Sequence, residues 1–500
     1  MKKITVSFIV FFFSFPYNFS FAQLRVGDPG VTVNQSKIDA NSSKYPQMSR
    51  WANAGVVGGI PFMNDTNFPK KATINAGNSA VINAAIVALS NTLNAGQKGL
   101  LTLNNGNYTI DASITMKSNV SLKGQSREGV VCTITMVGGN AFSFNNVSKC
   151  GLYNLTIQGG WGIPVYAWNY SLDENEEITN DNISVKLFGT TNNCWLDKVT
   201  ILNSANDPLR CVGEHNTLRD LIVDGCHRKA GGAEGYFFIQ SRDNLITGCK
   251  ITHLRHISLQ GGNVEYNVVY DNDFKQEVSF HSGDNGNNLI EYNKITLPTD
   301  MPPVTANEPG PAIIKTNAPD YFAIMGPWSS QHTNSAFPNY AYRNSCLQNN
   351  HNYSPTNTPW SDNSKVYFGP TKIAVKLADK IVNFPEYGAG TPIGGTLYAV
   401  NGFTPINTLS VHTTDIDLRK QNVYVSPNPF NETIKLFLKE NHGYNKATLL
   451  DSSGKTLLSK TIDKSSVETE FNLENLNLKP GVYILKLNGS SVKNIKLIKE

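Results

Sequence analysis

The chain has 500 residues, of which 40% are hydrophobic and 16% are charged, and its formal net charge at pH 7 is +4. This length favours two or three globular units over one. The charge is mild and no basic run is present, which excludes the electrostatic pattern of a nucleic-acid-binding protein but allows an anionic partner.

The first 22 residues have the pattern of a signal peptide. Lys2 and Lys3 give a positively charged start, "ITVSFIVFFFSF" gives an apolar core, and "SFAQ" offers small residues for cleavage after Ala22. The apolar run is short and contains Pro16, which disfavours a membrane anchor, and no later segment is apolar enough to cross a bilayer. We therefore expect an exported, soluble protein whose mature chain begins at residue 23.

Residues 78–96, "NSAVINAAIVALSNTLNAG", have apolar residues at helical spacing and end at a glycine, which predicts one amphipathic helix. The following "GLLTLNNGNYTIDASITMKSNVSLKGQ" predicts short strands separated by Asn-Gly and Lys-Ser-Asn turns. A helix at this place would cover the open edge of the first strands, which otherwise invites aggregation.

A short strand pattern recurs through the middle of the chain, in "KCGLYNLTI", "NNCWLDKVTI", "HNTLRDLIV", "DNLITGCKI", "GNVEYNVVY" and "NNLIEYNKI". Its spacing is 18 to 29 residues, with one gap of 43 that could hold a further coil. Repeated strand cores separated by loops of varied length are typical of a parallel β-helix. An Asn or Asp at one corner of each coil could bond to its neighbours above and below. The candidate corner positions are Asn154, Asp197, Asp220, Cys249, Asn267 and Asn293.

The opening helix followed by short strands resembles the pectate-lyase-like superfamily of right-handed parallel β-helices. The resemblance implies an all-β fold for residues 23–400, a right-handed parallel β-helix with an N-terminal capping helix. It does not imply one reaction, because that superfamily contains lyases, hydrolases and phage tailspikes.

Four consecutive strands align when their apolar residues are placed inside the coil. The inner pairs are Leu209/Cys211, Phe237/Ile239, Ile257/Leu259 and Val278/Phe280. A slip of one residue in any strand would turn its side chains to the other face. The outward residues form three columns with neighbours about 4.8 Å apart: Pro208, Tyr236, His256 and Glu277; Arg210, Phe238, Ser258 and Ser279; and Val212, Gln240, Gln260 and His281.

These columns contain more of the groups needed for β-elimination than for hydrolysis. Elimination at a uronate needs a base for the C5 proton, an acid for the leaving oxygen, and groups that stabilise charge on the carboxylate. His256, oriented by Glu277, is the candidate base and Tyr236 the candidate acid, and His281 is a further catalytic candidate. Hydrolysis normally needs two carboxylates about 5–9.5 Å apart, and the columns contain only Glu277. The candidate substrate-binding residues are Gln240 and Gln260 for hydrogen bonds, Phe238 for stacking, and Arg210, Arg228, Lys229 and Arg255 as cations for carboxylate or sulfate groups.

The segment "FIQSRDNLITGCKI…HISLQGGNVEYNVVYDNDF" resembles the core of the β-helical alginate and chondroitin lyases. Gln240, Ser241 and Asn244 match the family's "KS..N" layout. However, the family's catalytic lysine falls on Gln240, and its Arg-His pair falls on Leu259-Gln260. The resemblance therefore implies at most a distant relative with another catalytic set, and the calcium-assisted Lys/Arg mechanism of the family is not carried over.

The seven cysteines are odd in number and too few for a disulfide scaffold, and no CxxC pair or His/Cys cluster has zinc spacing. We expect the cysteines to be small buried hydrophobic residues. No metal site and no cofactor is predicted, although the turn "YDNDF" leaves a bound calcium open.

From Val423 onwards, alternating apolar residues and Gly/Asn turns predict a small C-terminal β-sandwich. The "SPNPF" opening, the "GVYILKL" strand and the lysine-rich end closely resemble the C-terminal sorting domain of the type IX secretion system of Bacteroidetes. The resemblance implies a sorting domain at 423–500 after a linker at 401–422, with the type IX machinery as a partner. It also implies that the protein is released or attached to the outer-membrane surface.

Together these features predict a secreted, monomeric enzyme that degrades a polysaccharide. The first interpretation is a polysaccharide lyase that cleaves an acidic, uronate-containing marine glycan by β-elimination. Two alternatives stay open: an endo-acting glycoside hydrolase on a sulfated algal polysaccharide such as fucan or carrageenan, and a non-catalytic glycan-binding surface protein.

Overall fold

The computed structural model of the chain describes residues 24–166, 180–229, 233–276, 278–280, 284–296, 336–337, 339–342, 344–347, 366–368, 372–373, 396–401, 423–426, 432–438, 443–451, 454–463, 468–490 and 492–499. The predicted signal peptide and residues 402–422 of the predicted linker lie outside this set. The chain divides into two compact units, residues 1–409 and 410–500. Among the helices of the described residues, none has both the length and the apolar character needed to cross a bilayer.

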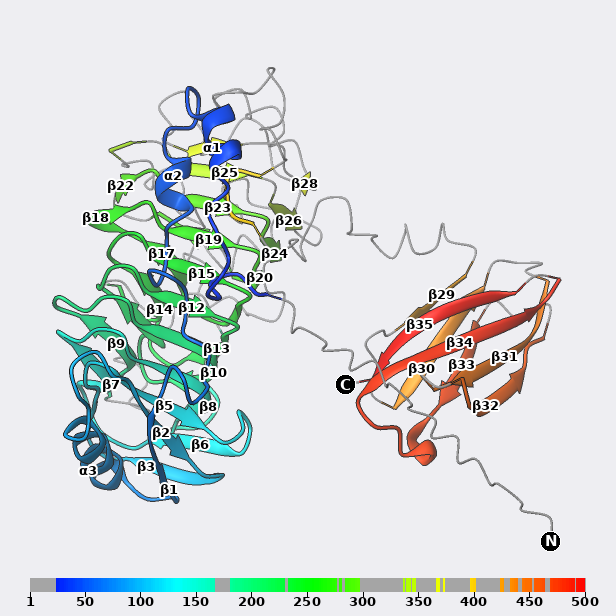
Figure 1. Ribbon diagram of the computed structural model, residues 1–500, viewed down its shortest axis with the longest axis horizontal. Coiled ribbons are helices and arrows are strands. Elements are labelled where there is room, and N and C mark those ends of the chain that lie inside the picture. The colour runs from blue at the N-terminus through cyan, green and yellow to red at the C-terminus, as the bar shows by residue number, and fades with distance from the viewer. Residues whose placement is uncertain are drawn as a thin grey trace, which may run out of the picture. The chain divides into compact units, whose positions relative to one another are not determined.

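The first unit is a parallel β-helix, which confirms the predicted fold class (Figure 1). Its short strands pair in parallel along three faces, here called the first, second and third face. The first face stacks β1 (Lys70–Ile74), β2 (Gly99–Leu103), β5 (Val120–Gly124), the first halves of β8 (Gly151–Gly159) and β10 (Trp195–Ser204), β12 (Thr217–Arg219), β15 (Leu245–Thr247), β19 (Val268–Tyr270), β23 (Leu289–Glu291), β25 (Asn339–Tyr342) and β27 (Val366–Phe368).

The second and third faces complete each coil. The second face stacks β3 (Gly106–Ile110), β6 (Val130–Ile134), the second halves of β8 and β10, β13 (Ile222–Cys226), β16 (Lys250–Thr252), β20 (Asp273–Lys275), β24 (Lys294–Thr296), β26 (Ser345–Leu347) and β28 (Lys372–Ile373). The third face stacks β4 (Ile114–Thr115), β7 (Asn140–Asn145), β9 (Ile183–Phe188), β11 (Leu209–Cys211), β14 (Tyr236–Ile239), β17 (His256–Leu259) and β21 (Val278–Ser279). A separate short pair joins β18 (Gly261–Glu265) to β22 (Asp284–Gly286).

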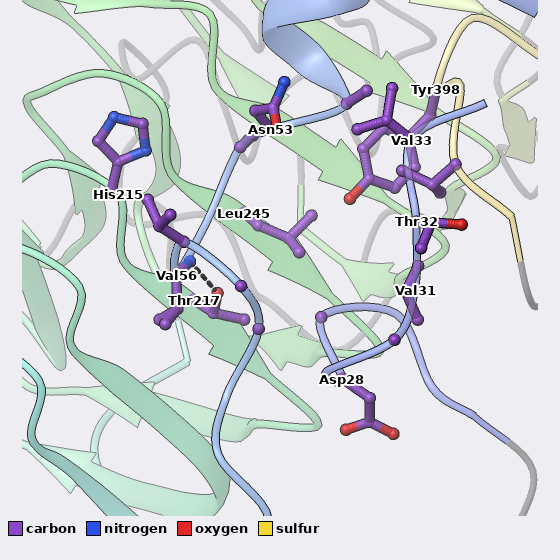
Figure 2. A pocket seen from close by; sticks show the side chains of 18 residues that line it. Asp28, Val31, Thr32, Val33, Asn53, Val56, His215, Thr217, Leu245 and Tyr398 are labelled. Carbon is purple, nitrogen blue, oxygen red and sulfur yellow. Dashed lines mark hydrogen bonds between the residues drawn. The ribbon is translucent and has the colours of Figure 1, made fainter. Parts of the chain in front are cut away.

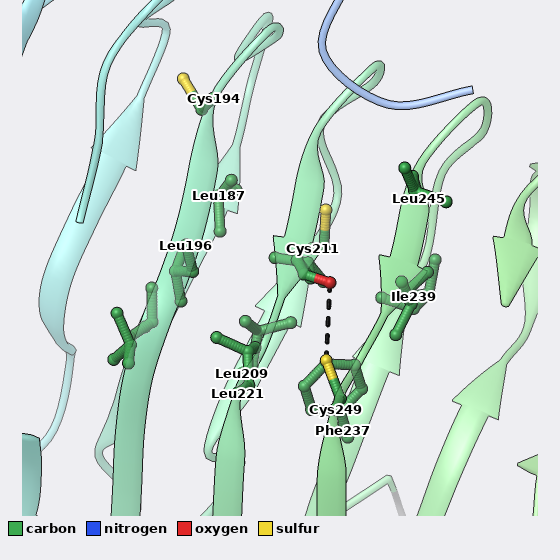
Figure 3. Close-up of a cluster of buried hydrophobic side chains, with 14 of the residues drawn as sticks. Leu187, Cys194, Leu196, Leu209, Cys211, Leu221, Phe237, Ile239, Leu245 and Cys249 are labelled. Carbon is green, nitrogen blue, oxygen red and sulfur yellow. Dashed lines mark hydrogen bonds between the residues drawn. The ribbon is translucent and has the colours of Figure 1, made fainter. Parts of the chain in front are cut away.

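The inside of the coils is apolar, because every face turns alternate side chains inward. Figure 3 shows Leu209, Cys211 and Phe237 of the third face packing toward Leu221 and Cys249. The six cysteines with described side chains are buried free thiols, which confirms their predicted role in the core. Burial raises the pKa of four of these thiols to about 12: Cys132, Cys211, Cys226 and Cys249.

Two ladders of buried asparagines stabilise the corners of the coils. In each step a side-chain amide donates to the Oδ1 atom of the next asparagine over 2.7–3.1 Å. The same Oδ1 atom accepts a backbone N–H of the preceding coil, so the turn has few unsatisfied polar groups. The ladder at the corner before the first face contains Asn216, Asn244, Asn267, Asn288 and Asn339. The ladder at the corner before the second face contains Asn272, Asn293 and Asn344.

The prediction of a single polar corner is therefore wrong. Asparagines occupy two different corners of the coils, so Asn267 and Asn293 belong to different ladders. Asn154 and Asp220 lie instead at a bend with positive φ between the first and second faces. Of the other two positions, Asp197 is ion-paired to Arg219, and Cys249 donates its backbone N–H to Asn272.

Helix α3 (Ser79–Ser90) lies at the start of the β-helix beside β1 and β2, as predicted for a capping helix (Figure 1). It ends at Ser90, before the glycine that was expected to terminate it, because residues 91–97 form turns.

Residues 24–69, here called the strap segment, were not predicted to have any structure. They run along the outside of the first face and include α1 (Gln35–Asn41) and α2 (Met48–Trp51) (Figure 1). Buried Arg219 of β12 bonds to Asp28 of the strap at 2.6 Å, and Arg50 of the strap bonds to Asp243 at 2.7 Å. These ion pairs hold the strap segment on the β-helix.

The second unit is the predicted β-sandwich. One antiparallel sheet contains β29 (Val423–Ser426), β30 (Thr433–Leu438) and β33 (Glu468–Asn472), and the other contains β32 (Thr456–Thr461), β31 (Tyr444–Leu450), β34 (Gly481–Gly489) and β35 (Lys493–Lys499). Residues of both sheets share one core, as Leu436, Leu449 and Leu485 illustrate. A 3₁₀ turn, η5 (Glu474–Leu476), connects β33 to β34.

Candidate functional site

The outer side of the third face carries the predicted columns. β11, β14 and β17 pair without a shift, so Tyr236 lies opposite His256, and Phe238 lies between Arg210 and Ser258. β21 continues this register, with Ser279 beside Ser258. The predicted register is therefore confirmed for these strands. Two predicted catalytic residues, Glu277 and His281, lie outside the described residues.

The aromatic rings of the site form a compact row. The ring of Tyr236 lies edge-on to that of His256, with centroids 4.8 Å apart at 76°, and to that of Phe238 at 5.2 Å. Tyr236 is 1% exposed and His256 is 0% exposed. The two candidate proton-transfer residues are thus adjacent, but both are covered in this structure.

A buried carboxylate that the sequence did not reveal bonds to two residues of this face. Asp207 is 0% exposed, accepts the backbone N–H of Tyr236 at 2.8 Å, and accepts Nε–H of Arg210 at 2.8 Å. Burial raises the pKa of Asp207 to about 6, although Arg210 acts in the opposite direction. The guanidinium of Arg210 in turn lies 5.2 Å from the ring centroid of Phe238. Asp207 therefore positions both Tyr236 and Arg210.

The other three predicted cations are tied to the chain around residues 226–235. Arg228 pairs with Glu234 at 2.8 Å. Lys229 is 0% exposed, donates to the carbonyl oxygens of Val165 and Cys226, and has a lowered pKa because of its burial. Arg255 is 8% exposed and donates to the Lys229 carbonyl at 3.4 Å. Their described contacts are structural, which leaves Arg210 as the predicted cation that lies within the columns.

The predicted glutamines lie beside the aromatic row and are half-buried. Gln240 and Gln260 directly follow β14 and β17, and the Gln260 side chain accepts the Ser258 hydroxyl at 3.1 Å. Their amide groups can donate hydrogen bonds to a carboxylate.

Lys186 of β9 is a further cation of this face that the sequence reasoning missed. It pairs in register with Arg210, and its Nζ atom lies 5.1 Å from the Phe188 ring centroid. The alternation in "ISVKLF" (183–188) could have revealed it, but the 43-residue gap in the repeat concealed this coil.

No group of three or more His, Cys, Asp or Glu side chains within the described residues is arranged to hold a metal ion. At the "YDNDF" turn, the Asp273 carboxylate lies 3.7 Å from the ammonium of Lys294.

A cavity of about 460 Å³ lies elsewhere, between the strap segment and the first face (Figure 2). His215, Thr217 and Leu245 line it from the β-helix, and the backbone N–H of Val56 donates to Thr217 at 2.9 Å. Asp28 at its edge is already paired with Arg219. We therefore assign the candidate site to the third face.

Comparison with known protein families gives a match in the second unit. Residues 422–500 match the secretion system C-terminal sorting domain. The second unit is thus a type IX sorting domain, as its motifs predicted, and the protein is secreted or held at the cell surface. No curated protein matches the chain.

Solved structures similar to the chain have very different sequences. The A-module of a mannuronan C-5 epimerase from Azotobacter vinelandii is 11% identical over 60% of this chain and 97% of its own, with a TM-score of 0.30. A surface adhesin of Streptococcus pneumoniae is 12% identical over 60% and 77%, with a TM-score of 0.37. A tailspike protein of an E. coli bacteriophage is 10% identical over 84% and 88%, with a TM-score of 0.35. Similarity this low carries no conclusion about a reaction.

Proposed function

We propose that the β-helix unit is an enzyme that binds an acidic polysaccharide on the outer side of the third face and cleaves it by β-elimination. The observation that carries this proposal is the contact of Tyr236 with His256 on adjacent strands, at 4.8 Å between ring centroids. Arg210 lies on the neighbouring strand β11, and the half-buried Gln240 and Gln260 directly follow β14 and β17.

In the proposed mechanism, His256 removes the C5 proton of a uronate and Glu277 orients the imidazole. The C4–O bond then breaks as a C4=C5 double bond forms, and Tyr236 protonates the departing oxygen. Hydrogen bonds from Gln240 and Gln260 stabilise the charge on the carboxylate. Arg210, two strands from His256, binds the anionic group of a neighbouring sugar. Phe238 contributes a stacking surface, and His281 is retained as a further catalytic candidate. The burial of Tyr236, Phe238 and His256 means that a local opening has to admit the sugar.

A second candidate function is glycan binding without cleavage, and the complete covering of His256 favours it. Hydrolysis has less support within the described residues of this face. Hydrolysis normally needs two carboxylates that reach the sugar. The described carboxylates of this face, Asp207 and Glu234, are both paired with arginines.

The test is to incubate the full chain with alginate, pectate, ulvan, chondroitin, fucoidan and carrageenan, following both ultraviolet absorbance of unsaturated uronyl ends and reducing ends. We expect both signals to rise together on a uronate-containing glycan. Reducing ends without absorbance would indicate a hydrolase, and binding without either signal would indicate the non-catalytic function.

Two variants link the activity to the site. His256→Ala should lower kcat by about 100-fold or more, and Tyr236→Phe should lower it while keeping the ring packing. His215→Ala, which removes a histidine outside the third face, should retain full activity. Circular dichroism distinguishes a catalytic loss from unfolding. Wild-type rates in a folded His256→Ala protein would overturn the assignment.

A further inference from the structure

Lys186 and Arg210 place two positive charges next to each other on stacked strands. They pair in register on β9 and β11, whose backbones are about 4.8 Å apart. Lys186 is partly buried, and its pKa is lowered first by this burial and then by the charge of Arg210. An arrangement of like charges in a partly desolvated position is unfavourable unless an anion compensates it.

The described residues supply only part of that compensation. Asp207 is the carboxylate that bonds to Arg210, through its Oδ2 atom. Within the described residues, Lys186 makes no ion pair, and Asp207 is the one carboxylate that raises its pKa. Among the described residues, Lys186 and Arg210 therefore share one carboxylate, and the pair keeps an excess positive charge.

The surroundings of this pair suit a sugar. Phe188 and Phe238 flank the two cations, at 5.1 Å from the Lys186 Nζ atom and 5.2 Å from the Arg210 guanidinium carbon. Phe188 is partly exposed, whereas Phe238 is buried, so Phe188 is the ring of the two that a sugar reaches in this structure. Aromatic side chains next to cations can bind the apolar face and the anionic substituent of one acidic sugar together.

The Lys186–Arg210 pair lies at a distance from His256 that suits a different sugar of the same glycan. β9 lies three strands from β17 along the stack β9-β11-β14-β17, which corresponds to about 14 Å. A glycan that follows the stack would place one acidic sugar at Lys186 while another lies at His256.

We infer that Lys186 and Arg210 form a subsite for an anionic group, a carboxylate or a sulfate ester, on a sugar remote from the bond that is cleaved. The inference rests on the proposed function in one respect, the binding of a glycan along the third face. It requires a substrate with negative charge on more than one sugar.

The test is to measure binding of the full chain to polygalacturonate, to carrageenan and to a neutral β-glucan at several NaCl concentrations. Lys186→Met should weaken binding of a polyanion several-fold at low salt and make the affinity less salt-dependent, because one ion pair is lost. Lys250→Met, which removes an exposed lysine of β16 on the second face, should bind as the wild type does. The polyanion that loses affinity identifies the group as carboxylate or sulfate.

Binding is measured in the His256→Ala background, in which we expect no cleavage of the glycan, and cleavage is measured in the chain that keeps His256. The two readouts together separate the two proposals. Lys186-dependent binding without any cleavage would leave the subsite standing and reject the elimination. Cleavage with wild-type affinity and salt dependence in Lys186→Met would reject the subsite and leave the enzyme. If none of the polyanions binds, both are overturned.

Discussion

Asp207 shows how one buried charge can make both stability and site geometry depend on pH. Its folded pKa of about 6 lies above the ordinary value of 3.8, so the folded protein binds this proton more tightly than the unfolded chain does. The groups that act on it are Arg210, Glu234 and the Tyr236 N–H. Protonation of Asp207 therefore stabilises the folded protein, and this stabilisation is complete below the pKa of the unfolded chain and is lost as the pH rises through 6.

Asp207→Asn tests this directly, since the Asn carbonyl can still accept the Tyr236 N–H. Between pH 7 and pH 4, the free energy of unfolding of the wild type should rise relative to the variant by about 2–3 kcal/mol. Urea denaturation at both pH values measures the difference. Parallel pH profiles of the two proteins would contradict the prediction.

At the scale of single residues, the sequence predicts to which side of a strand a side chain points better than it predicts whether that side chain is exposed. The outward columns followed from apolar alternation, because a strand turns alternate side chains to opposite sides. The burial of His256 did not follow from it, because a residue on the outer side of a strand can still be covered by other parts of the chain. Asp207 was missed for a related reason: it precedes a strand, where no periodicity applies.

The asparagine ladders are the elements that fix the coil corners, and Asn267 is a central member. Its amide donates to the Ser241 carbonyl at 2.7 Å and to Asn288 at 2.9 Å, and its Oδ1 atom accepts from Asn244. Asn267→Ala should lower the free energy of unfolding by about 3–5 kcal/mol, since several buried partners lose their bonds together. Exposed Asn91, at the end of α3, provides the control: Asn91→Ala should change the stability by less than about 0.5 kcal/mol.

Chemical denaturation of both variants gives the comparison. Equal effects at the two positions would show that the ladder contributes no more than a surface residue.

The strap segment depends on buried ion pairs in the same way. Arg219 is 2% exposed and bonds to Asp28 of the strap, to Asp197 and to the Val26 carbonyl. Arg219→Met leaves two buried carboxylates without this partner, which should cost about 3–5 kcal/mol. We expect the strap to detach first, so limited proteolysis should cut within residues 24–69 while the β-helix stays intact.

Arg242→Met is the matched control, because its ion pair with Glu214 is 44% and 43% exposed. Such a surface pair contributes roughly 0–1 kcal/mol. A strap that resists protease equally in both arginine variants would disprove the role of Arg219.

At the scale of elements, the repeat could be predicted but its corners could not. Strand cores recur visibly in the sequence. The two corners both use asparagine and are separated by only a short strand, so their asparagines look like a single series. The strap escaped prediction because its ordering depends on partners such as Asp243, nearly 200 residues away in sequence.

At the scale of the whole molecule, the chain combines a β-helix and a sorting domain, each with its own hydrophobic core. Separate cores imply that each unit unfolds independently. Deleting residues 423–500 should therefore leave the thermal midpoint of the β-helix unchanged, while the full chain shows one additional transition.

In the native host the deletion variant should accumulate inside the cell envelope instead of reaching the medium or surface, because residues 422–500 match the sorting domain. Calorimetry and cell fractionation measure the two effects. A deletion variant that is exported normally would contradict the sorting role, and a β-helix that unfolds without the second unit would contradict the independence of the two cores.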